Sequence, residues 1–367
     1  MTSRRIPFLS LAPGDDRDAV RAAMDRVVSR GCFVLGPELD AFEHEFAAAM
    51  GAAHAVGVGT GTDALALLFK ALDIGPGDEV ITTPLTAAYT ALAVMMAGAR
   101  PVFADIDPKR LTVDPSAVEN AIGRRTRAIL PVHLYGQAAD MTAIQHIAAR
   151  HHLAVVEDCC QAHLATACGR PVGTIGAGGA FSFYPTKNLG ALGDGGAVVT
   201  NDAALAERIR RLRNGGQSDR YHHLEAGVNS RLDELQAAIL RARLPRLSAW
   251  TDARRRLASS YRAHLVDAPI DLVPECDSGH VYHLFVVRSG ARAALQAHLA
   301  AAGIETLIHY PVPVPQQPAL SATSPAACPA AGRACREVLS LPLHPAMTGD
   351  DVEEIAAAVT AFQMTRK

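Results

Sequence analysis

Short apolar runs recur along the first part of the chain and alternate with segments of helical periodicity. The runs have the length and β-branched content of buried strands, and they are HAVGV, EVITTP, RPVFADI, RAILPVHL, LAVVED, GAFSFY and GAVVTN. Helical patterns fall between most of them, around residues 64–72, 115–122, 141–150 and 203–213. Strands that alternate with helices form a sheet whose two faces are both covered. The pattern therefore predicts an α/β protein with a mostly parallel sheet of seven strands.

Helical patterns also precede and follow this region. Residues 15–51 show two amphipathic helices, the second opened by Pro37 at a position where proline is favoured. After the last apolar run, a long helical pattern leads from Ser230 toward Leu265 and is broken at Pro245. We therefore expect helices before the sheet and a long, interrupted helix after it.

The remainder of the chain has a different organisation. It contains the apolar run VYHLFVV, a helical pattern over residues 293–302 and the segment IETLIHYP, which together indicate a smaller α+β unit. We therefore expect two domains. The large one covers residues 1–245 and includes the N-terminal helical segment, and the small C-terminal α+β domain covers residues 246–367.

One uncharged stretch, residues 81–99, is long enough to span a membrane. Pro84, Gly98 and several threonines interrupt it, and it divides into EVITTP and the small-residue segment AAYTALAVMMAG. A buried strand, a loop and a helix account for this composition better than a membrane span does. We therefore expect no membrane association.

Composition narrows the partners and the compartment. The 367 residues carry a net charge of −2 and no basic run, which argues against nucleic acid as a partner. The seven cysteines form no CxxC pair and are odd in number, so they indicate neither a disulfide framework nor a zinc site. The adjacent histidine pairs 151–152 and 222–223 lack further ligands at metal-binding spacing, and we expect no metal. Free thiols fit the cytoplasm.

The first candidate for chemistry is Lys187, in the segment FSFYPTKNLGALGDGGAVVTN. It lies on a loop bounded by Pro and Gly between two strand-like runs, and no acidic residue follows it until Asp194. Desolvation and nearby cations lower the pKa of an amine, and a neutral amine condenses with an aldehyde as a Schiff base. The alternative is an ordinary surface lysine beside a Gly-rich hairpin.

A second candidate, Asp158, ends the apolar run in VVEDCCQAH. Ligands of parallel α/β sheets bind outside the carboxyl ends of the strands, so an acid at this position can point into the site. A carboxylate at such a place can keep a basic nitrogen of a bound ligand protonated. Without further evidence, a solvated acid at a strand end explains Asp158 as well as a ligand-binding acid does.

A third candidate is the turn in VGVGTGTDALALLFKAL, where a strand leads through glycines into a helix. The N–H groups at such a helix start bind phosphate, and the helix dipole assists them. The turn is not a dinucleotide fingerprint, because Thr62 occupies the place of the third glycine of G-x-G-x-x-G.

These motifs, in this order, resemble those of the DegT/DnrJ/EryC1/StrS sugar aminotransferases, and the resemblance extends from Ile6 to about Ala358. The family consists of pyridoxal phosphate (PLP) enzymes with the aspartate aminotransferase-like fold, fold type I. The resemblance implies that Lys187 holds PLP as a Schiff base, that Asp158 meets the pyridine nitrogen and that Gln161 contacts the ring hydroxyl. The cofactor alternates between PLP and its aminated form, PMP.

The same resemblance implies the phosphate ligands and a dimer. The turn residues Thr60, Gly61 and Thr62, with Ser182, correspond to the family's phosphate site. The motif GVNSRLDELQAAIL reads by itself as an amphipathic packing helix. In the family its asparagine, here Asn229, reaches the phosphate of the neighbouring subunit's cofactor, which implies a homodimer with shared active sites.

Other segments resemble the family more loosely, and the sequence departs from it in places. The resemblance implies substrate contacts at Tyr135, His163, His283, His309 and Tyr310. The family usually carries an aromatic residue after TTP that stacks on the PLP ring, whereas this sequence has Ala87, and Tyr89 is the candidate substitute. Cys159 and Cys160 replace small residues beside Asp158, where we expect them to act in packing.

The function implied is transfer of an amino group from an amino acid, usually L-glutamate, to a nucleotide-linked keto-sugar in amino-sugar or antibiotic biosynthesis. By the same resemblance, the segment LIHYPVP favours a 3-keto-6-deoxyhexose. Dehydratases of the family replace the lysine by histidine, so Lys187 argues against that activity. A keto-cyclitol aminotransferase and a non-catalytic regulatory homologue remain as alternatives, because a fold does not fix a function.

Overall fold

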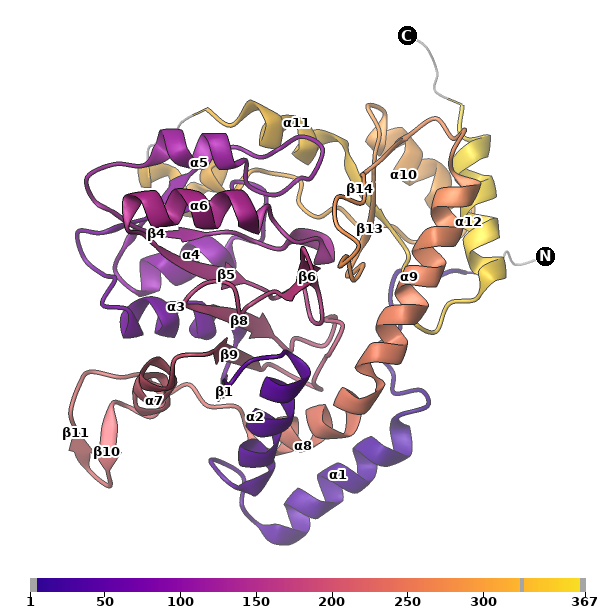
Figure 1. The fold of residues 1–367 in the computed structure, drawn as a ribbon. Helices are drawn as coiled ribbons and strands as arrows, with labels where there is room; N and C mark the ends of the chain where they lie inside the picture. The colour runs from indigo at the N-terminus through magenta and orange to yellow at the C-terminus, as the bar shows by residue number, and fades with distance from the viewer. Residues whose placement is uncertain (1–4, 324–326, 364–367) are drawn as a thin grey trace.

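The computed structural model describes residues 5–323 and 327–363, and a seven-stranded sheet forms its centre (Figure 1). Every apolar run predicted as a strand contributes one strand. In spatial order these are β1 (His54–Val58), β9 (Gly196–Thr200), β8 (Gly178–Ser182), β5 (Ala154–Asp158), β4 (Thr126–Leu130), β2 (Glu79–Thr82) and β3 (Arg100–Phe103). β9 pairs antiparallel with β1 and β8, and the pairs from β8 to β3 are parallel. The predicted fold class is confirmed.

Alternate residues of the strands face two separate hydrophobic cores. Val80 and Val156 pack into one core, whereas their neighbours Ile81 and Val155 pack into the other. The first core includes the helices α3 (Gly61–Ala71), α4 (Tyr89–Met96) and α7 (Ala203–Leu212). The second includes α2 (Pro37–Ala49), α5 (Pro115–Ala121), α6 (Met141–His151) and α8 (Glu234–Arg243). Continuous apolar strands therefore reflect a sheet buried on both faces.

The long helical pattern after the sheet is interrupted at Pro245, as predicted. Proline removes a helical hydrogen bond, and the short 3-10 turn Leu244–Arg246 separates α8 from α9 (Leu247–His264). α1 (Arg17–Arg30) packs beside α8. α9 runs from the sheet to the C-terminal elements (Figure 1).

The C-terminal elements enclose a core of their own. An antiparallel sheet in the order β12 (Asp271–Leu272), β13 (Phe285–Arg288) and β14 (Val338–Leu341) packs with α9, α10 (Arg292–Ala301) and α12 (Gly349–Ala361). α11 (Pro329–Glu337) joins a neighbouring cluster. Ile6 packs in this C-terminal core and pairs with Ile304, so the N-terminal residues lie with the C-terminal elements. The boundary at residues 245 and 246 stays a prediction.

The remaining elements are short. Two small hairpins are β6 (Thr166–Ala167) with β7 (Arg170–Pro171), and β10 (Gln217–Asp219) with β11 (His222–His223). The second hairpin projects beyond α7, away from the C-terminal elements (Figure 1). Single 3-10 turns are η1 (Leu134–Gly136), η3 (Val314–Gln316) and η4 (Pro318–Thr323). None of the described helices combines the length and the hydropathy needed to cross a bilayer. The uncharged stretch 81–99 is a strand, a loop and the helix α4.

Candidate active site

The three candidate motifs meet at one edge of the sheet. β5 and β8 are parallel, with Asp158 opposite Ala180, so Asp158 and the loop that carries Lys187 follow the same carboxyl edge. β1 is antiparallel to β9, as β8 is, and therefore also ends at this edge, where α3 begins at Gly61. Topology thus brings together residues that are far apart in the chain, as the rule for ligand sites in α/β sheets predicts.

Lys187 is partly buried, in a loop closed by a hydrogen bond from its own backbone N–H to the carbonyl of Tyr184 at 2.8 Å. Burial lowers the pKa of its amine, an effect that the nearby Cys160 and Asp158 partly oppose. A lowered pKa increases the fraction of neutral amine, which is the form that attacks an aldehyde.

Asp158 is held in one orientation by two donors. Its side chain is 5% exposed; Oδ2 accepts a hydrogen bond from the Thr90 hydroxyl at 2.8 Å, and Oδ1 accepts one from the backbone N–H of Cys160 at 3.1 Å. The hydroxyls of Thr90 and Thr86 lie 3.0 Å apart. Sequence reasoning missed Thr90. The available signal was the threonine-rich turn after β2, which ends at the same sheet edge.

The glycine-rich turn at the start of α3 presents free backbone donors. Thr60 caps the helix, and its hydroxyl accepts from the N–H of Asp63 at 3.0 Å. The N–H groups of the first helical residues, Gly61 and Thr62, have no partner within the helix. A Cβ added at Gly61 would lie 2.7 Å from Cys160 Sγ and 2.9 Å from Ser182 Cβ. The ends of β5 and β8 therefore approach the helix start so closely that only glycine fits.

These residues suit a PLP cofactor. A lysine with a lowered pKa, a fixed carboxylate and a helix N-terminus with free N–H groups offer partners for an aldehyde, a protonated pyridine and a phosphate, respectively. Burial raises the pKa of the Cys160 thiol well above its ordinary value, so the thiol stays protonated among them.

Four other predicted residues meet beside this edge through hydrogen bonds. Gln161 Oε1 accepts from the backbone N–H of Tyr135 at 2.7 Å, and Gln161 Nε2 donates to the Tyr310 hydroxyl at 3.1 Å. The Tyr135 hydroxyl donates to the carbonyl of His309. Burial raises the pKa of Tyr310 to about 12 and lowers that of His309 to about 4, so both side chains are neutral at physiological pH. Gln161 therefore links η1 to the segment around Tyr310.

His283 approaches from the C-terminal elements. Its Nδ1 lies 3.1 Å from Oδ1 of Asn188, the residue after Lys187. Its pKa is well below the ordinary value because the ring is buried, and the positive charge of Lys187 contributes. The structure therefore places His283 next to the loop that carries Lys187 and Asn188, which we call the lysine loop.

Three of the remaining predicted residues are either enclosed in the core or exposed on the surface. His163 is fully buried and packs against the rings of Phe46, Phe181 and Phe183; burial lowers its pKa to about 3. This position gives no support to a substrate contact. Tyr89 is 66% exposed and Asn229 is also exposed, so both lie on the surface of a single chain. Ala87 is partly buried, and whether Tyr89 covers the cofactor ring stays a prediction.

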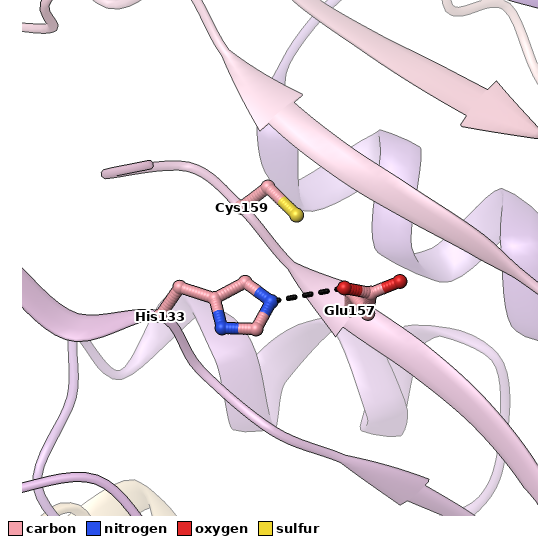
Figure 2. Close-up of side chains that lie close together, drawn as sticks. All are labelled: His133, Glu157 and Cys159. Carbon is pink, nitrogen blue, oxygen red and sulfur yellow. Dashed lines mark hydrogen bonds and ion pairs between the residues drawn. The ribbon is translucent and has the colours of Figure 1, made fainter. Parts of the chain in front are cut away.

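His133, Glu157 and Cys159, the last two being the chain neighbours of Asp158, form a buried cluster whose residue types can bind metals (Figure 2). The Glu157 carboxylate accepts from His133 Nε2 at 3.1 Å and from three backbone N–H groups of residues 173–176 at 2.8–2.9 Å. His133 Nδ1 accepts from the N–H of Ala139 at 3.1 Å. Burial raises the pKa of the Cys159 thiol well above its ordinary value. The carboxylate and both ring nitrogens of the cluster are already partnered within the protein, which is the arrangement of a structural network, and the absence of a metal stays a prediction.

Comparison with known proteins agrees with this geometry. The model of the DegT/DnrJ/EryC1/StrS aminotransferase family matches residues 15–360. The chain is 50% identical over 347 residues to dTDP-3-amino-3,4,6-trideoxy-alpha-D-glucose transaminase of Streptomyces venezuelae, across 93% of this chain and 92% of that protein. It is 46% identical over 345 residues to UDP-N-acetyl-3-dehydro-alpha-D-glucosamine 3-aminotransferase of Acidithiobacillus ferrooxidans, across 94% and 93%, respectively.

A solved structure shows the same relationship. The crystal structure of S. venezuelae DesV in complex with a ketimine intermediate matches with a TM-score of 0.94 and 49% identity, over 97% of this chain and 98% of that one. A family match over most of the chain, a related protein at half identity and a common fold all agree with the motifs around Lys187, Asp158 and Gly61. The chain belongs to the DegT/DnrJ/EryC1/StrS aminotransferase family, and it is a PLP-dependent aminotransferase.

Proposed function

We propose that this chain transfers an amino group from L-glutamate to a nucleotide-linked keto-sugar, with Lys187 as the catalytic base. The observation that carries the proposal is the position of Lys187. Its amine has a lowered pKa and lies at the sheet edge that also carries Asp158 and the start of α3. A neutral amine at this place can both attach the cofactor and accept a proton.

Each residue of the site has a distinct role in this proposal. Asp158 holds the pyridine nitrogen protonated, and the turn residues Thr60, Gly61 and Thr62, with Ser182, bind the phosphate. Gln161 borders the ring hydroxyl. When bound, PLP supplies the electron sink for the carbanion formed at the substrate carbon.

Lys187 performs the proton transfers. Nζ would take the proton that leaves the Cα of the donor amino acid and would carry the proton of the reverse transfer on the sugar. The two half-reactions share one site, so ping-pong kinetics follow.

The proposed acceptor is a 3-keto sugar nucleotide. Both relatives described above carry a 3-amino or 3-dehydro sugar in their names, one linked to dTDP and the other to UDP. Tyr135, His283, His309 and Tyr310 come together near Lys187, and we propose that they border the sugar. Neutral imidazoles and phenols suit an uncharged sugar, because they donate and accept hydrogen bonds without a counter-ion.

A homodimer completes the proposed site. Asn229 is exposed and lies beside Val228, which is 41% exposed, and other exposed apolar side chains include Phe33 at 50% and Tyr184 at 52%. Exposed apolar groups of this size favour an interface. We propose that a second copy covers them and brings its Asn229 to the cofactor phosphate. The seven free cysteines fit a reducing cytoplasm.

An absorbance experiment tests the proposal. The purified protein, loaded with PLP, is mixed with L-glutamate and then with a panel of keto-sugar nucleotides and keto-cyclitols. We expect a yellow band that glutamate bleaches and that one 3-keto sugar nucleotide restores. If only a keto-cyclitol restored the yellow band, the acceptor would be a cyclitol and not a sugar nucleotide. A protein that takes up no PLP would contradict the enzymatic function.

A variant tests the lysine separately. Lys187→Ala should bind PLP without turnover, because cofactor contacts remain while the proton carrier is lost. Normal transamination by this variant would show that another residue moves the proton.

A further inference from the structure

The residue after the cofactor lysine has both ends of its side chain engaged by the C-terminal elements. Asn188 is 5% exposed; Nδ2 donates to the carbonyl of Val281 at 3.2 Å, and Oδ1 lies 3.1 Å from His283 Nδ1. Both partners belong to one short segment, residues 281–283, which leads into β13 (Figure 1). A single side chain therefore joins the lysine loop to a segment about ninety residues away.

The hydrogen bonds of Asn188 determine which ring nitrogen of His283 carries the proton. Since the amide nitrogen of Asn188 donates to Val281, its oxygen must accept, and His283 Nδ1 therefore carries the proton. Burial and the charges of Lys187 and Arg254 keep the pKa of the ring well below its ordinary value. His283 is thus a neutral imidazole in one tautomer, with its ring plane fixed by Asn188.

Residues 281–283 are also held by Arg254, through hydrogen bonds to their backbone carbonyls. Arg254 of α9 is 4% exposed, and its NH1 donates to the carbonyls of Tyr282 and His283 at 3.3 Å and of Leu343 at 2.8 Å. Within residues 5–323 and 327–363, no carboxylate pairs with this guanidinium. The hydrogen bonds of its NH1 all go to backbone carbonyls, whereas its buried Nε has no hydrogen-bond partner in the described part of the chain, so Arg254 orients the segment rather than an acid.

The large unit contributes backbone contacts to the same segment. The N–H of Val281 donates to the carbonyl of Gly136 at 3.0 Å, and the N–H of Leu284 donates to the carbonyl of Tyr135 at 3.3 Å. Gly136 has φ of +94°, and a Cβ there would lie 2.8 Å from the N of His283. Residues 281–284 are therefore held by Arg254 on one side and by residues 135–136 on the other, in addition to their contacts with Asn188.

We propose that Asn188 and His283 are positioning residues for Lys187, which set where its amine lies relative to the cofactor carbon. The inference rests on the proposed role of Lys187 and deepens it: His283 acts through the lysine loop and not through substrate alone. Proton transfer depends steeply on placement, so loosening this link changes the rate of the step that Lys187 performs.

The test uses full-length, PLP-loaded enzyme with four variants. Asn188→Ala and His283→Ala each remove one side of the link, their double variant removes both, and His283→Asn keeps an N–H donor near the position of Nδ1. The matched control is Asn201→Ala, because Asn201 also holds a backbone N–H, that of Ala53 at 2.9 Å, but beyond the far end of β9.

Three readouts separate positioning from simple packing or substrate binding. They are the apparent pKa of the visible absorbance of bound PLP, the rate constant of the half-reaction with glutamate, and KM for the sugar. We expect each single variant to shift the absorbance pKa and to slow the glutamate half-reaction on the order of tenfold to a hundredfold. The double variant should be no slower than the slower single one, since both remove the same link, and His283→Asn should recover part of the rate.

Several outcomes would overturn the inference. A glutamate half-reaction within twofold of the unmodified rate in Asn188→Ala and His283→Ala would do so, as would losses that simply multiply in the double variant. A change confined to KM for the sugar would make His283 a substrate contact only. If Asn188→Ala fails to fold, the inference is tested by comparing the glutamate half-reaction of His283→Ala with that of His283→Asn. Turnover by Lys187→Ala would contradict the proposed function, whereas inactive Lys187→Ala with unaffected link variants contradicts only this inference.

Discussion

The hydroxyl of Thr90, in the first turn of α4, donates to Oδ2 of Asp158 at 2.8 Å, across a separation of 68 residues. A hydrogen bond to a charged acceptor contributes about 1.5 to 3 kcal/mol, so this one has consequences for the group that Asp158 holds. The contact makes α4 part of the cofactor site although its sequence carries no acid or base.

We predict that Thr90→Val weakens PLP binding about tenfold, because Asp158 loses a donor and with it a fixed orientation. Thr90→Ser keeps the hydroxyl and should bind PLP nearly as the unmodified protein does. Equilibrium titration of the apoprotein with PLP measures both. Equal affinities in the valine and serine variants would show that the backbone N–H of Cys160 orients Asp158 sufficiently.

Lys187 should make the stability of the apoprotein depend on pH. In the unfolded chain its amine titrates near 10.5, and burial lowers that pKa in the folded chain. Between the two values the unfolded state binds more protons, so the free energy of unfolding rises as the pH rises toward 10.5. Lys187→Met should therefore be more stable than the unmodified apoprotein at neutral pH, with a difference that shrinks toward pH 10.5. Parallel denaturant titrations at several pH values measure it, and a constant difference would contradict the assignment.

Gly61→Ala should disrupt the phosphate turn. The added Cβ would meet Cys160 Sγ at 2.7 Å and Ser182 Cβ at 2.9 Å, and overpacking of this kind costs about 1 to 3 kcal/mol. Gly290→Ala is the matched control, since nothing lies within 4 Å of its added Cβ. We expect reduced melting temperature and PLP affinity in Gly61→Ala alone. Partial recovery in Gly61→Ala with Cys160→Ala would identify the thiol as one source of the clash.

Glu157→Gln should destabilise the fold without any involvement of metal. The Glu157 carboxylate accepts hydrogen bonds from N–H groups on both of its oxygens, and glutamine would replace one of these oxygens by an NH2 group, which is itself a donor. The N–H groups facing that NH2 would lose their acceptor, and each buried donor left unpaired costs about 1 to 3 kcal/mol. Chemical denaturation measures the loss. A chelator should leave stability and absorbance unchanged, and stoichiometric zinc in the purified protein would overturn this interpretation of the cluster.

Mixed dimers test whether Asn229 acts across an interface. Lys187→Ala and Asn229→Ala are each expected to be poorly active, but a dimer with one subunit of each contains one intact site if Asn229 serves its partner's cofactor. Equal mixing with subunit exchange should then restore roughly a quarter of the unmodified activity, since half of the dimers are mixed. If Asn229 served its own subunit, mixing would restore nothing.

The sequence predicted the parts of the site that depend on local pattern and topology. Lys187 and Asp158 follow apolar runs, and the rule that ligands bind at the carboxyl ends of strands brings them together. The glycine turn before α3 could be identified for the same reason. These predictions needed only the order of strands and helices.

The parts that it missed depend on contacts between distant segments. Thr90 with Asp158, and Asn188 with His283, are pairs whose members lie 68 and 95 residues apart, and no local motif shows that the two members of either pair are in contact. His163 shows the opposite case. It lies within a recognisable motif, but Phe46 of α2 packs on it and encloses the ring, and no local pattern reveals which helix covers a strand end.

The link through Asn188 also bears on how the protein is made. The central sheet is complete in sequence at Thr200, yet the groups that hold the Asn188 side chain and the amide nitrogen of Gln161 come later in the chain, from Val281, His283 and Tyr310. On the ribosome, domains fold as they emerge, and the sheet can form before that segment has been synthesised. Cofactor loading is therefore expected to be a late event in biosynthesis, so that newly made chains acquire PLP only after nearly the whole polypeptide has been translated.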